Sequence, residues 1–502
     1  MYSQLQNLYP ILLSDTIVYD RPMMLYIGTG GSLRVLTSGG DDVTLRNVPD
    51  GSTLPILVSK VFATGSTVGN VLATQFDGDV LSYFSTLPSW VLREYSLAFD
   101  AEGAEDLGDY EAGILYFRDS NFNRVPATFS RTTTATRVNE QGLIETVATN
   151  VPRIDYTDGS AKLLMEPSRT NILKYSSLLI GNWLAYGINY SATTVVSPEG
   201  VNNANIIVED NSNGVHRIQE IIIVNTGTTY TFSVFVKSIS GTRTFAVSTS
   251  PTKTQAIFNL QNGTVTSLIS GASASIEPYI NGWYKCTVIG NPTTTSGSHA
   301  FRIGMGDGTS LSYQGDNTSS IAIWGAQLEE GSYPTSYIPT AGSAVTRNAD
   351  SASKSSATSY IGQTEGTLYC DFTFNAEGDV FVITDGLNSI VNYVGIFRNS
   401  NNLLFRIRYN SSNNINFTTP HTIGQRYKIA IAYKSGDSAA FVNGLQVGTT
   451  NTTAFSFTNS LSHFEFLNRV YYVSPTIGLN DYNNVSLFPT RLTNAELQQL
   501  TL

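Results

Sequence analysis

The stretch from Trp324 to Asp350 constrains the fold of this chain more than any other feature of the sequence. Residues 327–329 are expected to lead the chain out of a preceding strand. Pro334 and Pro339 fix φ and lack an N–H, so neither suits a central strand, and each favours extended backbone at the residue before it. A second β-rich block begins near Glu365. We therefore expect an extended segment at the seam between two β-domains.

The composition is that of an all-β protein. Charged residues make up 14% of the 502 residues, against about 25% in a typical soluble protein. Polarity comes instead from Ser, Thr, Asn and 42 Gly, and the chain carries 27 Tyr and 24 Phe. Aromatic and β-branched side chains suit a pleated, half-buried surface. The predicted fold class is all-β, a multidomain string of β-sandwiches.

Charge and hydropathy exclude several kinds of partner. A net charge of −10 argues against nucleic-acid binding, which requires a basic surface. No apolar run of about 18 residues occurs, so no membrane insertion is predicted. The first ten residues lack the basic region and apolar core of a signal peptide, so we expect synthesis in a cytoplasm. Cys286 and Cys370 lie in strand-like runs of different units and are predicted to be buried free thiols.

Strand and turn patterns divide the chain into four predicted units. The first holds short strands between Gly-rich turns, and the second reads as a connector with hairpins. The third holds about eight strands, which favours a jelly roll, and the fourth holds another long strand series. The units are residues 1–77, 78–165, 166–347 and 348–502.

Local patterns predict specific turns and one helix start. Asn139–Gly142 is typical of a tight hairpin turn. The dipeptides Asn262-Gly263 and Asn443-Gly444 are typical of two-residue hairpin corners. Thr493 is predicted to cap a helix that begins at Asn494.

Two motifs bracket the third unit. One is Leu-Leu-Met-Glu-Pro-Ser-Arg-Thr-Asn at 163–171. The other begins Trp-Gly-Ala-Gln-Leu-Glu at Trp324, continues through Pro-Thr-Ser-Tyr-Ile-Pro-Thr and closes with Thr-Arg-Asn-Ala-Asp. The pair resembles elements of phage virion proteins, mostly tail-fibre and spike components. The resemblance implies a virion adhesin without enzymatic activity in this part.

The run from Leu25 to Thr74 includes Ile-Gly-Thr-Gly-Gly-Ser-Leu-Arg-Val and Val-Thr-Leu-Arg-Asn-Val-Pro-Asp-Gly-Ser. It resembles the head-spike base proteins of tailed phages and gene transfer agents. The resemblance implies that residues 1–77 anchor the chain to other virion proteins, at a capsid vertex or connector. The expected location is the virion surface, and head versus tail position stays open.

Two further runs resemble carbohydrate-binding folds. Asn-Gly-Trp-Tyr-Lys-Cys-Thr-Val at 281–288 is similar to a strand of carbohydrate-binding jelly rolls. Tyr-Lys-Ile-Ala-Ile-Ala-Tyr-Lys from Tyr427 and Leu-Phe-Pro-Thr-Arg-Leu-Thr-Asn-Ala-Glu-Leu from Leu487 resemble the concanavalin-like, laminin-G type of lectin sandwich. That fold implies host-surface glycans as ligands, in some members with calcium.

Candidate glycan-binding residues combine arginine forks with aromatic faces, which suit hydroxyl-rich ligands. Four of them fall on adjacent strand segments of the fourth unit, and the alternative is that they are ordinary solvated strand residues. Trp183, like Trp283 and Trp324, could be a sugar platform, although a tryptophan on an alternating strand is more often part of a core. The candidates are Tyr393, Arg406, Arg408, Tyr409 and Trp183.

No catalytic or cofactor site is predicted. The four histidines do not recur at metal-ligand spacing. The acidic run 100–111 could hold calcium but lacks the EF-hand pattern and is expected to be a solvated loop. Glu329-Glu330 and Glu220 could in principle supply a glycosidase carboxylate pair. We predict a non-enzymatic head spike or fibre that binds host glycans, with a glycan depolymerase and a purely decorative capsid protein as alternatives. A homo-oligomer is expected, trimeric as in fibres or pentameric at a vertex.

Overall fold

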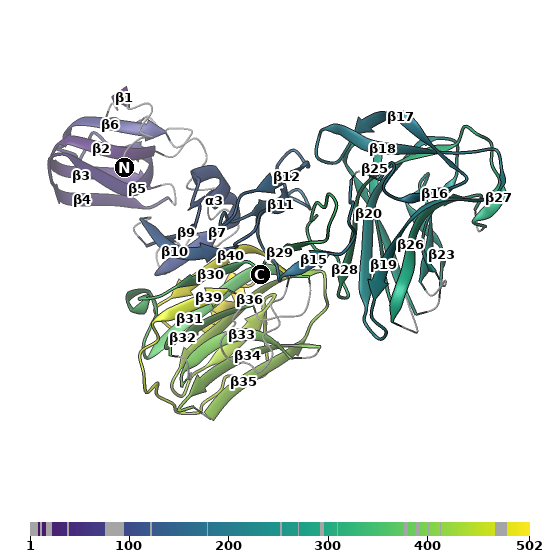
Figure 1. Cartoon of the computed structure of the whole chain (residues 1–502). Helices are drawn as coiled ribbons and strands as arrows, with labels where there is room; N and C mark the ends of the chain where they lie inside the picture. Colours follow the sequence, from purple (N-terminus) through teal and green to yellow (C-terminus); the bar gives the residue numbers. More distant parts are fainter. Residues whose placement is uncertain are drawn as a thin grey trace.

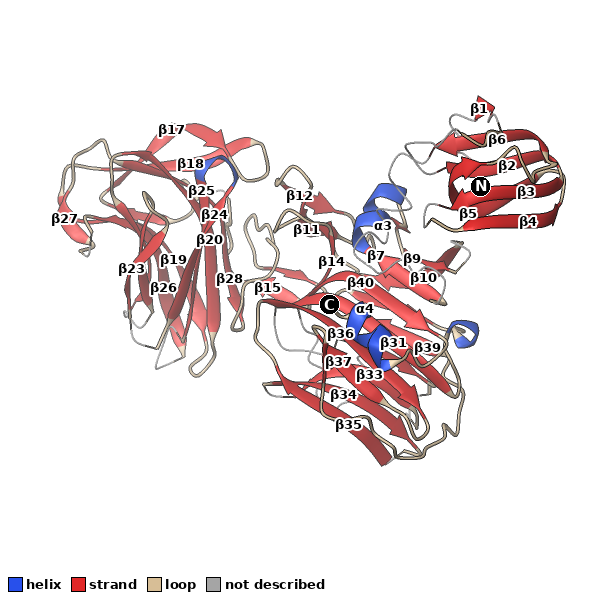
Figure 2. Ribbon diagram, turned by 180° about the vertical axis from the view of Figure 1, so that it is seen from behind, coloured by secondary structure: helices blue, strands red, loops and turns tan. Residues whose placement is uncertain are grey.

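The structure is a computed structural model, and the residues that it describes are 9–10, 13–16, 23–37, 40–75, 95–120, 123–177, 179–250, 254–269, 271–291, 296–308, 310–375, 380–387, 391–399, 401–411, 413–466 and 479–502. Antiparallel strands dominate these ranges (Figures 1 and 2). The predicted all-β fold with several β-sandwiches is confirmed. Within the same ranges, no helix has the length and apolar character needed to cross a membrane.

The N-terminal sheet is one curled, six-stranded antiparallel sheet in the order β1-β6-β2-β5-β3-β4. Its curl brings Thr67 onto β3, where the Thr67 N–H donates to the carbonyl of Ser32 at 2.7 Å. Buried aliphatic side chains such as Leu25, Val35 and Val58 form its own core. Its strands are β1 (Tyr9–Pro10), β2 (Met23–Thr29), β3 (Gly31–Thr37), β4 (Asp42–Val48), β5 (Ser52–Val61) and β6 (Gly69–Gln75).

The C-terminal sandwich is built from two separate parts of the chain. Its first part supplies β7 (Leu97–Asp100), α3 (Ala101–Leu107), β8 (Tyr110–Glu111), β9 (Ile114–Asp119), β10 (Arg124–Ser130), β13 (Ile154–Asp155) and β14 (Lys162–Met165). Its second part supplies β30 (Ser351–Lys354), β31 (Glu365–Phe374), β32 (Phe381–Thr384), β33 (Tyr393–Asn399), β34 (Asn402–Tyr409), β35 (Asn413–Pro420), β36 (Gln425–Lys434), β37 (Ala439–Val442), β38 (Leu445–Gln446), β39 (His463–Phe466), β40 (Asn480–Phe488) and α4 (Asn494–Leu500).

The strands of the predicted connector belong to this sandwich. One sheet runs β9-β10-β30-β39-β32-β33-β34-β35, and the facing sheet runs from β40 through β31, β36 and β37 to β38. Both β7 and β14 pair with β40, and β7 also pairs with β9, so the connector strands close one edge. Residues 95–165 are therefore not a spacer between units. They complete the same hydrophobic core, in which Phe117 packs against Phe464 with ring centroids 4.8 Å apart.

The inserted sandwich lies between the two parts of the C-terminal sandwich. One of its sheets has the order β16-β19-β26-β21-β22-β23, with β27 beside β19, and the other has the order β17-β18-β28-β20-β25-β24. Its strands are β16 (Leu184–Tyr186), β17 (Ile188–Val196), β18 (Asn202–Glu209), β19 (Asn213–Val224), β20 (Tyr230–Ser240), β21 (Thr244–Ser250), β22 (Gln255–Asn259), β23 (Thr264–Leu268), β24 (Ser273–Tyr279), β25 (Trp283–Gly290), β26 (Gly297–Gly306), β27 (Ser312–Gln314) and β28 (Ser320–Glu330).

A short antiparallel ladder forms the neck of the insertion. β15 (Arg169–Asn171) pairs with β29 (Val345–Arg347), so the chain enters and leaves the inserted sandwich side by side. Both strands come from the two motifs that bracket this unit in the sequence. The seam predicted around Trp324–Asp350 is thus the exit from the insertion. Its first part differs from the prediction, because β28 continues through Gln327 and Glu329 to Glu330.

A hairpin from the first part of the C-terminal sandwich docks on the inserted sandwich. β11 (Ala135–Val138) and β12 (Ile144–Val147) form the hairpin, with the predicted turn at Asn139–Gly142. Ile144 packs with Phe235, Trp283 and Trp324 on the outer face of the β28 sheet. The Ile144 N–H also donates to the carbonyl of Pro198 at 2.9 Å. This contact fixes how the two sandwiches sit against each other.

Most of the remaining local predictions are confirmed. Asn443 and Gly444 both have positive φ, 47° and 77°, in a two-residue corner between β37 and β38. The two-residue corner predicted at Asn262-Gly263 is wrong, because Asn259 pairs with Thr264 and residues 260–263 form a longer hairpin loop in which Gly263 has a φ of 66°. Thr493 caps α4 in a capping box with Glu496. Cys286 and Cys370 are free and buried in the two different sandwiches.

Candidate functional site

Three of the predicted glycan residues share the outer face of the β32–β35 sheet. Tyr393 of β33 lies opposite Arg408 of β34, and Arg406 lies one step along the same face, opposite Gly395. Because successive strand residues face opposite sides, Tyr409 faces inward, where its ring lies 5.5 Å from that of Phe455. Tyr409 is thus not part of the outer face, and its predicted grouping with Arg408 is wrong.

Tyr393 supports the two arginines and offers no open ring face. Its side chain is 3% exposed, in a cluster with Phe397. The Arg406 Nη1 donates to the Tyr393 hydroxyl at 3.3 Å, and the Arg406 Nε donates to Asn416 Oδ1 at 2.8 Å. The Arg408 guanidinium carbon lies 5.9 Å from the centre of the Tyr393 ring. The ring and the amide therefore orient a half-buried guanidinium pair on the sheet surface.

Trp183 is part of the core of the inserted sandwich. It is 3% exposed, and its Nε1 donates to the carbonyl of Tyr175 at 3.2 Å. Its predicted use as a sugar platform is therefore excluded in this conformation, because no ring face is open. Trp283 and Trp324 are each 1% exposed and pack in the cluster beneath the docked hairpin, as the core alternative predicted.

The acidic run 100–111 is ordered by internal contacts. Asp100 caps α3 by accepting from the backbone N–H groups of Glu102 and Gly103. Asp109 is fully buried and pairs with Arg118 at 2.5 Å and with Arg124 at 2.8 Å. The expectation of a solvated loop is therefore wrong. Among the described residues, no group of three or more His, Cys, Asp and Glu side chains is placed to hold a metal ion.

The suggested carboxylate pair is not brought together. Glu329 lies on β28 beside the core residue Leu328, so it faces outward from the inserted sandwich. It is buried there and accepts from the backbone N–H of Thr335. Glu220 lies on β19 in the other sheet, where its carboxylate accepts from the Lys174 N–H. These two carboxylates cannot flank one glycosidic bond in this arrangement.

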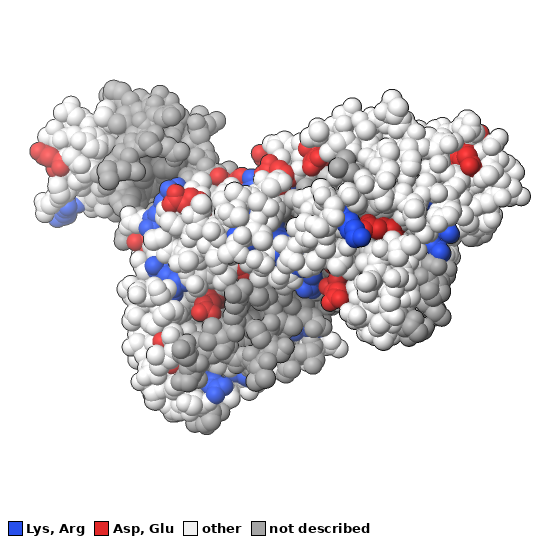
Figure 3. Space-filling model, viewed as in Figure 1, with Lys and Arg blue, Asp and Glu red and all other residues white. Residues whose placement is uncertain are grey.

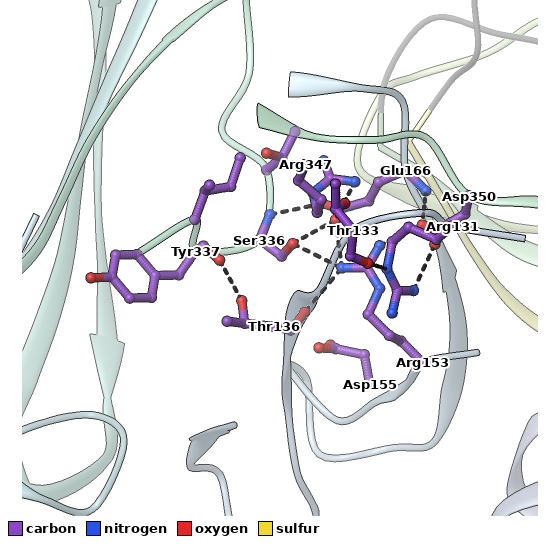
Figure 4. A network of polar contacts seen from close by, with 12 residues as sticks. Arg131, Thr133, Thr136, Arg153, Asp155, Glu166, Ser336, Tyr337, Arg347 and Asp350 are labelled. Carbon is purple, nitrogen blue, oxygen red and sulfur yellow. Dashed lines mark hydrogen bonds and ion pairs between the residues drawn. The ribbon is translucent and has the colours of Figure 1, made fainter. Parts of the chain in front are cut away.

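The most concentrated cluster of charge is a buried network at the neck, which we call the joint network: Arg131, Arg153, Glu166, Arg347 and Asp350 (Figure 4). Arg153 donates to Glu166 at 2.7 Å and to Asp350 at 2.5 Å. Arg131 donates to the other oxygen of Asp350 at 3.0 Å. Arg347 places Nη1 3.3 Å from Glu166. Every member is at most 1% exposed, so the network offers no surface to a ligand.

Polar residues of the exit segment tie the inserted sandwich to this network. Ser336 donates both its backbone N–H and its hydroxyl to Glu166, at 2.8 and 2.6 Å. The Gln327 side chain accepts from the Ile338 N–H at 2.6 Å. The Thr136 hydroxyl of β11 donates to the Tyr337 carbonyl at 2.6 Å. The motif residues therefore hold one segment of chain in place.

Electrostatics favour the charged forms of Glu166 and Arg153. Burial alone would raise the pKa of Glu166, but Arg347, Arg153 and the hydrogen bonds from Ser336 outweigh it and lower that pKa to about 2. Burial likewise opposes the charge of Arg153, and the carboxylates of Asp350 and Glu166 reverse that effect and raise its pKa. The sequence alone does not identify the carboxylate partners of Arg131 and Arg153. The signal that could have identified these partners is the set of charged residues in the two bracketing motifs, which includes Glu166 and Asp350.

No protein-family model matches this chain, and no curated protein matches it significantly. Solved structures similar to part of it include domain 4 of the extracellular GH43 arabinanase AbnA from Geobacillus stearothermophilus, in complex with arabinotriose. That match has 12% identity, a TM-score of 0.25 and coverage of 31% of this chain and 73% of the other. The CBM40 domain of the Ruminococcus gnavus IT-sialidase, bound to α2,3-sialyllactose, has 13% identity, a TM-score of 0.25 and coverage of 28% and 84%.

A third similar structure is the receptor-binding domain of a botulinum neurotoxin C/D mosaic serotype. It has 10% identity and a TM-score of 0.24, and the match covers 30% of this chain and 39% of the other. All three matches cover less than a third of this chain.

We predict that Glu166→Gln destabilises the protein strongly, because it leaves Arg347 buried without its carboxylate partner and Arg153 with Asp350 alone. Removing one partner of a buried ion pair costs about 3–5 kcal/mol. Chemical denaturation followed by tryptophan fluorescence measures the loss. Asp42→Asn is the control, since it breaks the half-exposed Arg34–Asp42 pair and should cost far less. Equal losses in the two variants would contradict a joint held by buried charge.

The low pKa of Glu166 also predicts acid sensitivity. A carboxylate whose pKa falls from 4.5 unfolded to about 2 folded contributes its full stability above pH 4.5 and loses it as the pH falls towards 2. Thermal unfolding measured between pH 6 and pH 2 should therefore show a steeper decline for the natural protein than for Glu166→Gln. Parallel declines would show that another group controls acid unfolding.

Proposed function

We propose that this chain is a non-catalytic adhesin of a phage particle that binds glycans through the outer face of the C-terminal sandwich. The guanidinium pair of Arg406 and Arg408, oriented by Tyr393 and Asn416 on a flat sheet surface, is the observation that carries the proposal. Guanidinium forks donate several parallel hydrogen bonds and suit the hydroxyl and ring oxygens of sugars.

The N-terminal sheet is the proposed anchor to other virion proteins. Its sequence resembles the base proteins of head spikes, and its strands have their own core and pair with no described strand of the remaining chain. A self-contained module at one end of the chain suits attachment to a particle, whether at a vertex or at another site. Immunoelectron microscopy of particles with antibodies against each part tests this placement. Accessible N-terminal epitopes on intact particles would contradict it.

A depolymerase is the second candidate function. The buried charges of the joint network pair with one another, and Glu329 lies in a different sheet from Glu220. Both observations support binding without cleavage. Incubation with purified host polysaccharide tests this part of the proposal. A rise in reducing ends over a buffer control would overturn it.

We predict that Arg406→Gln combined with Arg408→Gln weakens glycan binding about tenfold or more without unfolding the sandwich, since lost hydrogen bonds to charged donors each cost about 1.5–3 kcal/mol. A glycan array followed by titration calorimetry on the best ligand provides the measurement. Arg46→Gln, on the exposed surface of β4, is the control and should bind normally.

Full-length point variants are needed for this test. Deleting residues 348–502 would remove β40 and leave β7 and β14 without their partner, so lost adsorption after such a deletion would report unfolding. Unchanged binding in the arginine double variant would favour the decorative alternative for this face.

A further inference from the structure

The inserted sandwich has a second exposed sheet face, on the side away from the C-terminal sandwich. The β28 sheet faces the docked hairpin, so the sheet that holds β16, β19, β26 and β21 forms the far side. Both ribbon views show β19 and β26 on that side (Figures 1 and 2). Apolar side chains stand exposed on it, including Leu184 at 53%, Ile221 at 51% and Ile223 at 75%. Among the described residues, no sheet covers this face.

Strand register brings two arginines together in the middle of this face. Arg217 of β19 lies opposite Gly304 of β26, and Arg302 lies opposite Gln219, one step along the same side. A side chain at Gly304 would approach the Arg217 Cβ to 2.9 Å, so glycine makes room for this arginine. The Arg302 Nε donates to the Gln219 Oε1 at 3.3 Å, which orients its guanidinium along the sheet.

The two guanidinium groups have no acidic partner. Among the described residues, no carboxylate forms an ion pair with Arg217 or Arg302, and the buried Nε of Arg217 has no hydrogen-bond acceptor. Burial and the charge of Arg217 lower the pKa of Arg302. In a chain of net charge −10, with charged side chains scattered over the face drawn in Figure 3, an uncompensated arginine pair is unusual and favours an anionic ligand.

The surroundings of the pair suit a sugar ring. Tyr186 of β16 is 42% exposed, and its ring centre lies 5.1 Å from the Arg217 guanidinium carbon. Ser248 and Ala300 face the same side and form a floor of small side chains beside Arg302. An exposed aromatic edge next to a flat, partly hydroxylated floor can contact a pyranose, while planar guanidinium groups bind a carboxylate in a bidentate manner.

We propose that this face binds a carboxylate-bearing saccharide, with Arg217 and Arg302 on the carboxylate and Tyr186 against the sugar ring. This face would be a second glycan-binding surface that rests on the glycan binding proposed above, and its ligand would be an acidic sugar. The two faces lie on different sandwiches, so binding at each can be tested independently of the other.

Titration calorimetry on the full-length protein tests the inference with two acidic probes, trigalacturonate and sialyllactose, and their uncharged counterparts, the trigalacturonate methyl ester and lactose. We expect at least one acidic probe to bind about tenfold or more tightly than its counterpart, and added salt to weaken that binding. The probe that binds distinguishes a uronic acid from a sialic acid. If neither acidic probe binds, or if counterparts bind equally well, the inference is overturned.

Two double variants that each remove two positive charges show which of the two faces binds the acidic probe. Arg217→Gln with Arg302→Gln should abolish the preference for the acidic probe, while Arg406→Gln with Arg408→Gln should keep it. Arg217→Lys with Arg302→Lys preserves charge but not the planar fork, and an intermediate loss is expected. Circular dichroism should show unchanged folding of the Arg217 and Arg302 variants, because these two arginines form no ion pair within the described chain. A preference lost only in the Arg406 and Arg408 variant would overturn the inference and leave the proposed function standing.

Discussion

The buried ion cluster around Arg153 determines how the two sandwiches of this protein are joined. Arg153 binds Glu166 and Asp350 together, and these two residues stand immediately before and after the neck formed by β15 and β29. A buried guanidinium that spans the entry and the exit of an insertion holds both ends in one geometry. Buried charge contributes little net stability when it is paired, but it is costly to separate. The cluster therefore favours one arrangement of the joint over its alternatives.

The apolar contacts at the joint support the same arrangement. The β11–β12 hairpin covers the outer face of the β28 sheet, where Trp283 and Trp324 would otherwise be open to solvent. That coverage leaves the opposite sheet, with Arg217 and Arg302, as the free face of the inserted sandwich. On the C-terminal sandwich, Arg406 and Arg408 lie half-buried on the outer face of β33 and β34, beside the buried side chains of Tyr393 and Leu404. Both candidate binding faces thus belong to one body of fixed geometry, while the N-terminal sheet keeps a core of its own.

Local structure was predictable from the sequence, and strand partners were not. The hairpin turn at Asn139–Gly142 and the Thr493 cap match the structure, because short-range patterns determine them. The connector was misjudged because β7 pairs with β40 across almost the whole chain, and local propensity carries no information about such a partner. Gln327 and Glu329 were expected outside a strand because they are polar, yet their side chains are satisfied by the exit segment.

In the candidate sites too, local features were predictable from the sequence and long-range contacts were not. Arg408 and Tyr409 are adjacent, so strand alternation alone could have placed them on opposite faces. The burial of Tyr393 and Trp183 depends on packing that only the folded chain reveals. Tyr186, Arg217 and Arg302 are far apart in the sequence and meet only through the registers of β16, β19 and β26.

The antiparallel neck also makes the inserted sandwich an exchangeable part. Asn171 and Val345 are direct partners across the ladder, so the cut ends of the host sandwich lie about 5 Å apart. Any domain whose termini lie side by side could be inserted at this neck without disturbing the core of the C-terminal sandwich, since insertions are tolerated where chain ends are close. Recombination at this point would replace the inserted sandwich in one step and would leave Arg153, Glu166 and Asp350 paired beside the neck.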